Sequence, residues 1–317
     1  MSDPVLEVES LSISFGTTRH RSTVVHEVSF AVERGEIVGV VGESGSGKTL
    51  TAMGASDLLP AGAHRDAAKW VFDGTDLLGA DHRQRSGALG GKLAVVFQDP
   101  MSSLNPTRRV GNQLSDTARF WGKQSKPQAR ANAVEQLRRV RIAAPERRVS
   151  SYPHELSGGM RQRAMIAMGM MSTPSLIIAD EPTTALDVTV QADVMELFRE
   201  LNETEGTAIV LVSHNIALIS EICHRVLVMY AGRIVEEVSG ADLAHSARHP
   251  YTRALIGSVP SLDSDLDSEL ISIPGTPPDP SRLPPGCSFA DRCPLVPDRC
   301  RTDRPALANG VAGWEVD

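Results

Sequence analysis

The segment of residues 42–49 constrains the fold of this chain more than any other part of its sequence. It reads Gly-Glu-Ser-Gly-Ser-Gly-Lys-Thr and fits the pattern G-x-x-x-x-G-K-[ST]. A β-branched apolar run at 36–41 precedes it, and helix-compatible residues follow from Leu50. Glycines let the backbone wrap around phosphate, so that successive N–H groups and a helix N-terminus face the anion. The sequence therefore predicts a buried strand, a phosphate-binding loop and a helix in succession.

Two side chains at the end of this loop carry the phosphate chemistry. Lys48 would reach the β- and γ-phosphates of a nucleotide, and the Thr49 hydroxyl would bind Mg²⁺. The residues of the loop predicted to contact the nucleotide are Gly42, Glu43, Ser44, Gly45, Ser46, Gly47, Lys48 and Thr49.

Two adjacent acids, Asp180 and Glu181, follow the apolar run 176–179. After a buried strand, Asp180 is placed to hold Mg²⁺, and Glu181 is placed to orient or deprotonate an attacking water. The same pair could also be an ordinary strand end on a solvated loop. Because the chain also carries the phosphate-binding loop, the catalytic interpretation is favoured.

Buried-strand patterns alternate with helical patterns along most of the chain. Strands are predicted at 5–8, 24–32, 36–41, 92–97, 176–179, 208–212 and 225–229, and helices at 190–203 and 216–223. This alternation predicts an α/β domain with a largely parallel sheet. No strand-like run occurs between about 99 and 165, where residues 128–141 have helical apolar spacing, so a helical insert is expected there.

The composition changes after about residue 249, because nine prolines lie between 260 and 297. We therefore predict a nucleotide-binding domain at 1–250, with its insert at about 99–165, and a C-terminal extension at 251–317. We expect the extension to have little capacity for a core of its own.

Charge and hydropathy exclude several classes of protein. The 32 Lys and Arg residues against 39 Asp and Glu residues give a net charge of -7, which argues against a nucleic-acid partner. The longest apolar stretch, 164–171, is too short to span a bilayer. The first residues lack the apolar region of a secretory signal, so a cytosolic location is expected.

A Ser-Gly-Gly turn at Ser157, Gly158 and Gly159 would by itself be read as a helix N-cap. Together with the loop at 42–49, the acids after 176–179, Ala-Leu-Asp at 185–187 and Ser-His at 213–214, it resembles the ATP-binding cassette (ABC) ATPase family over about residues 5–245. The resemblance implies a P-loop ATPase with a RecA-like core, an N-terminal antiparallel β subdomain and a helical insert.

The resemblance also implies the roles of single residues. Two cassettes would pair head to tail, so that each ATP lies on one loop and is closed by Ser157, Gly158 and Gly159 of the partner. The remaining assignments are Gln98 to Mg²⁺ and the attacking water, His214 to the γ-phosphate, Phe15 to the adenine ring and Asp187 to the interface between cassettes. The predicted catalytic residues are thus Glu181, His214, Gln98 and Lys48. A core position for Phe15 and a structural hydrogen bond for His214 stay open as alternatives.

Residues 97–106, 152–160, 249–255 and 285–294 resemble the ATPases of dipeptide and oligopeptide importers, a subfamily that includes nickel importers. This implies an ATP-hydrolysing subunit at the cytoplasmic face of the membrane. Its expected partners are a second, related ABC ATPase subunit, two transmembrane permeases and an extracytoplasmic substrate-binding protein. A nickel or other small-solute importer, or a soluble ABC ATPase acting on a cytosolic partner, are the alternatives.

Three cysteines, Cys287, Cys293 and Cys300, are close together in the proline-rich extension. Thiolates are ligands for a [4Fe–4S] cluster or for zinc, and the resembled subfamily can carry such a cluster in its extension. The fourth ligand is unknown, and three thiols without a metal are the alternative. Cys223 is expected to be buried in a helix. The expected cofactors are ATP and Mg²⁺, with the [4Fe–4S] cluster as an additional hypothesis.

Overall fold

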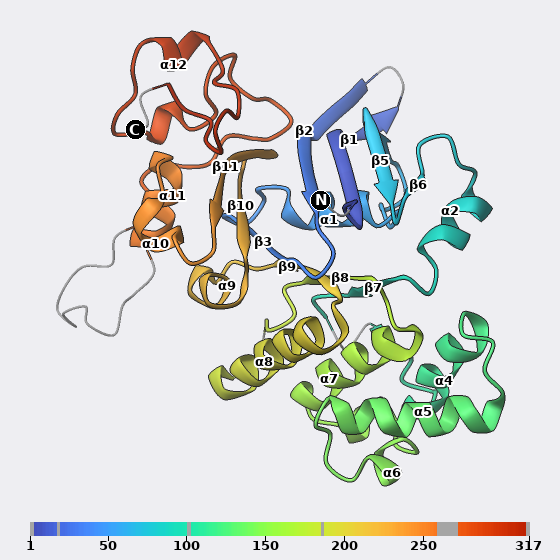
Figure 1. Cartoon of the computed structure of the whole chain (residues 1–317). Coiled ribbons are helices and arrows are strands. Elements are labelled where there is room, and N and C mark those ends of the chain that lie inside the picture. The colour runs from blue at the N-terminus through green and yellow to red at the C-terminus, as the bar shows by residue number, and fades with distance from the viewer. Residues whose placement is uncertain (1–2, 18–19, 100–102, 185–186, 259–271, 315–317) are drawn as a thin grey trace. The chain divides into compact units, whose positions relative to one another are not determined.

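The computed structural model describes residues 3–17, 20–99, 103–184, 187–258 and 272–314. Figure 1 labels the helices and strands along the chain. The chain divides into two compact units that interleave along the sequence. The first unit comprises Met1–Leu6, Val32–Glu36 and Val71–Leu211, and the second comprises Glu7–Ala31, Ile37–Trp70 and Val212–Asp317. The predicted boundary at 250 and 251 is not tested by this division and stays a prediction.

The first unit contains buried parallel strands. β7 (Leu93–Val96) and β8 (Leu176–Asp180) pair in parallel, and β9 (Ala208–Val212) neighbours β8. All residues of β8 and β9 are buried, as expected for β-branched runs covered on both faces. The first unit also has an antiparallel hairpin of β5 (Lys69–Phe72) and β6 (Thr75–Asp76). Its turn, Asp73 and Gly74, has positive φ at both residues.

The described residues of the first unit also include helices. They are α2 (His82–Leu89), α4 (Val110–Phe120), α5 (Lys126–Arg139), α6 (Pro145–Arg148), η1 (Pro153–Glu155), α7 (Gly158–Gly169), η2 (Met170–Ser172) and α8 (Val188–Glu205). No strand occurs among the residues described between β7 and β8, which agrees with the helical pattern of that part of the sequence.

The helix α5 shows how the sequence specifies this region. Ser125 and Gln128 form a capping box at its start, and Ala129, Ala133 and Leu137 are fully buried on one face because they are spaced by four residues. Burying a leucine side chain contributes roughly 2 kcal/mol to folding. The buried face packs against α4 and α7.

The second unit contains strands of two kinds. β1 (Leu6–Thr17) neighbours β2 (His20–Val32) and pairs antiparallel with β4 (Ala63–Asp66), which confirms the antiparallel N-terminal strands. β3 (Ile37–Val41) pairs in parallel with β10 (Arg225–Tyr230), which pairs antiparallel with β11 (Arg233–Ser239). The α/β prediction is therefore confirmed.

The helices of the second unit follow its strands along the chain. They are α1 (Lys48–Ala55), α9 (Ile216–Ile222), α10 (Leu243–Ser246), α11 (Pro250–Gly257), η3 (Ala290–Arg292) and α12 (Arg299–Thr302). Gly39 of β3 lets α9 approach the sheet, since a Cβ at this position would lie 2.5 Å from Cγ2 of Ile219. Cys223 is buried, as predicted, but it follows α9 as its C-cap in extended conformation and does not lie within the helix.

An aromatic cluster connects the C-terminal region to β10. The rings of Tyr230 and Tyr251 are 4.5 Å apart, and the ring of Phe289 lies 5.3 Å and 5.5 Å from them. All three side chains are fully buried. The expectation that the extension has little core capacity therefore misses this packing, because Phe289 is buried against a strand of the cassette.

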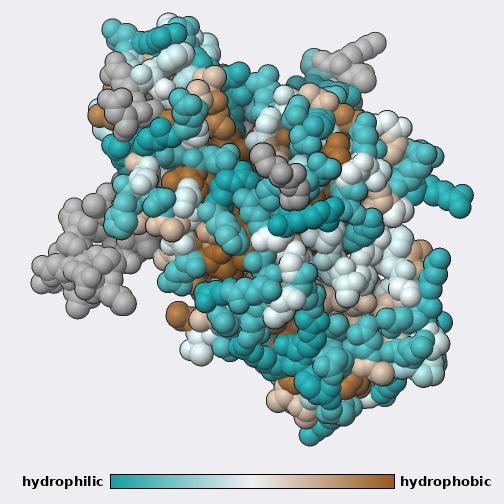
Figure 2. Space-filling model, viewed as in Figure 1, coloured by the Kyte–Doolittle hydropathy of each residue, from teal (hydrophilic) through white to brown (hydrophobic). Residues whose placement is uncertain are grey.

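Among the described residues, no helix has both the length and the apolar character needed to cross a bilayer. The face shown in Figure 2 is covered mainly by hydrophilic residues, with scattered apolar ones between them.

Candidate functional site

The loop between β3 and α1 is shaped by its glycines. Gly42 has a φ of +153°, and Gly47, the N-cap of α1, has a left-handed φ of +98°. A Cβ at Gly42 would lie 2.2 Å from the carbonyl oxygen of Met229, so only glycine fits there. The resulting turn leads into a helix N-terminus, which is the backbone arrangement that binds anions.

Lys48 lies against the start of this loop. Its side chain is buried, and its Nζ donates hydrogen bonds to the carbonyl oxygens of Gly42, at 2.9 Å, and Glu43, at 3.0 Å. Among the residues that the structure describes, the buried hydroxyl of Ser46 has no hydrogen-bond partner. Because buried polar groups are nearly always paired, this hydroxyl fits a ligand oxygen. The tight backbone, the cation and the unpaired hydroxyl together suit a phosphate group.

The acidic residues belong to the first unit. Asp180 is the last residue of β8 and is buried, and Glu181 follows with a left-handed φ of +45°. The carboxylate oxygen Oε2 of Glu181 accepts hydrogen bonds of 2.9 Å from Nε2 of Gln98 and of 2.9 Å from Oγ1 of Thr184. A strained backbone and two donors therefore fix the direction of this carboxylate. This arrangement can position a general base.

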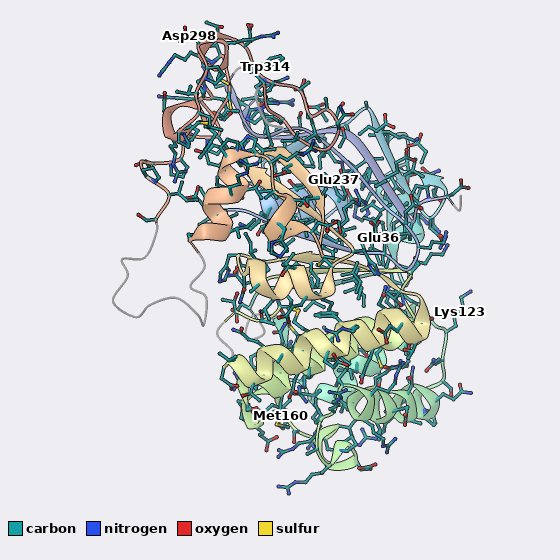
Figure 3. All side chains as sticks on the ribbon, turned by 60° about the vertical axis from the view of Figure 1, so that its left-hand side comes forward. Glu36, Lys123, Met160, Glu237, Asp298 and Trp314 are labelled. Atoms are coloured by element: carbon teal, nitrogen blue, oxygen red, sulfur yellow. The ribbon has the colours of Figure 1, made fainter. Side chains whose placement is uncertain are left out.

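The Ser-Gly-Gly turn opens α7, also in the first unit. Ser157 is the N-cap, and its hydroxyl accepts a hydrogen bond from the backbone N–H of Met160, the residue labelled in Figure 3. A Cβ at Gly159 would lie 2.8 Å from Cγ1 of Val190, so glycine lets α7 approach α8. Ser157 and Gly158 are exposed, and the turn is accessible to another molecule.

The remaining predicted residues have simpler surroundings. Asp187 is the exposed N-cap of α8 and accepts a hydrogen bond of 2.9 Å from the backbone N–H of Val190. His214 is exposed between β9 and α9. Phe15 lies near the end of β1 opposite Ala63 and is half-buried, so it is not enclosed in the core.

The predicted residues are divided between the two units. Gln98 and Glu181 are in hydrogen-bond contact in the first unit, which also contains Asp180, Asp187 and the turn at 157–159. The loop at 42–49 forms one compact group in the second unit, which also contains Phe15 and His214. Residues 185 and 186, which form part of the Ala-Leu-Asp motif, lie outside the described residues.

Sequence reasoning missed three contacts of these groups. Thr184 was not predicted to contact Glu181, although its position three residues later in a turn is a usable signal. Arg292 and Tyr251 of the C-terminal region hydrogen-bond to Glu43 of the loop, and no local pattern in the sequence indicates these contacts.

The cysteines of the extension line a small hollow. Cys287, Cys293 and Cys300 surround it together with His249 and with Trp314, which is labelled in Figure 3. Its volume is about 30 Å³. Burial raises the pKa of the Cys287 thiol. Among the described residues no group of three or more His, Cys, Asp or Glu side chains is arranged to hold a metal ion, so the [4Fe–4S] hypothesis is not supported.

Comparison with known proteins decides the family. The sequence profile of the ABC transporter family matches residues 25–184, which carry the loop, the turn at 157–159 and the acids. The chain belongs to the ABC transporter family. A second profile, described as the C-terminal region of oligopeptide/dipeptide transporters, matches residues 235–300 of this ABC transporter chain.

Similar proteins cover nearly the whole chain. The dipeptide transport ATP-binding protein DppD of Escherichia coli is 43% identical over 96% of this chain and 92% of its own length. The oligopeptide transport ATP-binding protein OppD of Salmonella typhimurium is 42% identical over 96% of this chain and 90% of its own length. This ABC transporter chain is thus an ATPase whose hydrolysis is coupled to transport, and ATP and Mg²⁺ are its expected cofactors.

Solved structures confirm the ABC fold. A dimeric post-hydrolysis state of the ATP-binding cassette MJ0796, bound to ADP and Pi, superposes with a TM-score of 0.65 at 25% identity, over 74% of this chain and 98% of that one. The cbiO1 protein of Clostridium perfringens, part of an ABC transporter complex, has a TM-score of 0.65 at 24% identity, over 76% of this chain and 90% of that one. The second likeness is evidence for the fold alone.

Proposed function

We propose that this chain is the ATP-hydrolysing subunit of a multi-subunit importer that takes up dipeptides or oligopeptides across the cytoplasmic membrane. The observation that carries the proposal is the loop at 42–49, in which left-handed glycines and the buried Lys48 form a phosphate cradle. The same chain matches the C-terminal region of oligopeptide/dipeptide transporters, and proteins named for dipeptide and oligopeptide transport are similar over almost all of it.

The residues of the loop and of β8 suit a magnesium nucleotide. Lys48 and the backbone N–H groups of 42–49 would bind the β- and γ-phosphates, with Phe15 against the adenine ring. Thr49, Gln98 and Asp180 would hold Mg²⁺, which supplies charge neutralisation at the phosphates. A buried carboxylate, an amide and a hydroxyl are oxygen donors of the kind that Mg²⁺ prefers.

Within the chain, Glu181 is the candidate general base. Gln98 and Thr184 donate hydrogen bonds to its carboxylate and so keep it in one orientation, and the carboxylate would accept a proton from the attacking water. His214 would donate a hydrogen bond to the γ-phosphate. We assign no role to an iron–sulfur cluster, because among the described residues no group of three or more His, Cys, Asp or Glu side chains is arranged to hold a metal ion.

The partners follow from the same proposal. The exposed turn at 157–159 supports pairing with a second, related ABC ATPase subunit, since its Ser157 hydroxyl and glycine N–H groups could close the partner's nucleotide. Two permease subunits and an extracytoplasmic substrate-binding protein would complete the importer. The chain would lie peripherally on the cytoplasmic face of the membrane, with Asp187 at the interface between cassettes.

Purification of the tagged chain from detergent-solubilised membranes tests this proposal. We expect membrane subunits to co-purify, and the complex in proteoliposomes to hydrolyse ATP faster when a dipeptide and the substrate-binding protein are added. A complex carrying Lys48→Ala should neither hydrolyse ATP nor take up labelled dipeptide. Stimulation by Ni²⁺ and not by peptides, or recovery of soluble partners alone, would reject peptide import.

A further inference from the structure

Glu43, the second residue of the phosphate-binding loop, is held at three points. Its backbone N–H donates a hydrogen bond of 2.7 Å to the hydroxyl of Tyr251. Its carbonyl oxygen accepts hydrogen bonds from the backbone N–H of Ser46, at 3.2 Å, and from Nζ of Lys48, at 3.0 Å. The backbone of the loop is therefore fixed at Glu43 from both sides.

The third point is the side chain. Nη1 of Arg292 donates to Oε2 of Glu43 at 2.8 Å, and Nη2 donates to Oε1 at 3.0 Å. Such a two-pronged pair fixes the direction of a carboxylate as well as its distance. The side chain of Arg292 is only 4% exposed and that of Glu43 is 25% exposed, so water screens this pair weakly.

The C-terminal region holds Arg292 in place. Its Nε donates to the carbonyl oxygen of Pro274 at 2.7 Å, and its Nη2 donates to that of Ile273 at 3.3 Å. Nη1 also donates to the hydroxyl of Tyr230 at 3.2 Å. The guanidinium therefore keeps its position only while the region around η3 is folded against β10.

The ion pair between Arg292 and Glu43 also affects phosphate binding, because it changes the charge of the loop. The carboxylate of Glu43 belongs to a loop whose backbone suits a polyanion, and an uncompensated negative charge there would repel phosphate. Arg292 neutralises it, and the hydrogen bonds with Glu43 raise the pKa of the guanidinium, which stays charged. A loop already fixed in its binding conformation also loses less entropy when the ligand binds.

We propose that Arg292 is a positioning residue for the phosphate-binding loop, acting through Glu43, so that folding of the C-terminal region sets the affinity of the cassette for nucleotide. The inference rests on the proposed binding of ATP by this loop. It gives the C-terminal region a part in the ATPase site, without contact between Arg292 and the nucleotide.

Steady-state ATPase kinetics of the full complex test this inference. Arg292→Gln should raise the KM for ATP about tenfold, which is within the usual range of affinity changes between coupled sites. Its kcat should stay within about twofold of the wild type. Arg292→Lys keeps the positive charge but cannot make both hydrogen bonds of the guanidinium to Glu43. Its KM for ATP should therefore rise by a smaller factor than that of Arg292→Gln. Arg299→Gln, in the same region and stacked on Trp314, is the matched control and should leave KM unchanged.

The double variant Glu43→Gln/Arg292→Gln tests whether Arg292 acts on the loop through Glu43. Because it also removes the carboxylate, its KM should lie below that of Arg292→Gln alone. An unchanged KM in folded Arg292→Gln, or a KM in the double variant equal to or above that of the single one, overturns the inference. If Arg292→Gln fails to fold by thermal melting, Arg292→Lys decides in its place: a raised KM supports the inference and an unchanged KM overturns it.

Failure of the proposed function would look different. If the wild-type complex shows no ATP binding that depends on Lys48, the nucleotide site itself is wrong. If the wild type binds ATP and Lys48→Ala does not, but Arg292→Gln has the wild-type KM, only the role of Arg292 is wrong.

Discussion

The side-chain amide of Gln98 donates a hydrogen bond of 2.9 Å to the carboxylate of Glu181, and the hydroxyl of Thr184 donates to the same oxygen. Gln98 follows β7 and Glu181 follows the parallel strand β8. The carboxyl ends of the two strands therefore meet at one edge of the sheet. At this edge Gln98 can hold the carboxylate of Glu181, the candidate base, in one orientation.

Replacing Glu181 by Gln tests its role as the base. The amide keeps the size of the side chain but cannot accept a proton, so we expect kcat to fall at least about 100-fold while ATP still binds. Phosphate release and equilibrium binding of a labelled nucleotide measure the two effects. A turnover within twofold of the wild type would remove Glu181 from this role.

Thr184→Val removes one donor to the same carboxylate and preserves the shape of the side chain. Since Gln98 still orients Glu181, we expect kcat to fall about tenfold or less, with the KM for ATP unchanged. The melting temperature serves as the control for folding. A change confined to KM would contradict a positioning role for this hydroxyl.

Ser157 combines a structural and a proposed functional role, and two substitutions separate them. Ser157→Asp retains an N-cap for α7 but places a negative charge where the partner's phosphates would lie. We expect a melting temperature close to that of the wild type and a loss of ATPase activity. Ser157→Ala should lose about 1 kcal/mol of stability with the cap. Full activity in the aspartate variant would argue that this turn stays away from nucleotide.

Stability should fall at acidic pH because of His249. Its side chain is almost fully buried, and burial lowers its pKa from 6.5 to about 4. Its Nδ1 accepts a hydrogen bond from the backbone N–H of Tyr251 and so caps α11, and only the neutral ring can do this. Between pH 6.5 and 4 the unfolded chain binds a proton that the folded chain does not, so the folded state loses up to about 3 kcal/mol as the pH falls.

His249→Asn is the matched variant for this effect. Asparagine can cap the helix and does not titrate, so denaturant unfolding of the variant should depend less on pH between 6.5 and 4. Equal pH dependence in the two proteins would show that other groups cause the acid sensitivity.

The sequence predicted the core strands β3, β8 and β9 because they are short, β-branched and buried along their whole length. The strand predicted at 208–212 coincides with β9, and the helix predicted at 216–223 ends one residue earlier, at Ile222. The hairpin of β5 and β6 was missed, although Asp73 and Gly74 are a typical turn pair. β11 was missed as well, because the charged residues Arg233, Glu236 and Glu237 interrupt its apolar pattern.

By itself, the sequence determined the phosphate-binding loop, the acids after β8 and the Ser-Gly-Gly turn, because each is a short segment whose chemistry lies in consecutive residues. Only the tertiary structure decided which distant side chains act on them. Gln98 meets Glu181 across 83 positions of the chain, and Arg292 meets Glu43 across 249. Such pairs depend on strand order and on the packing of the aromatic cluster around Phe289, which local periodicity does not record.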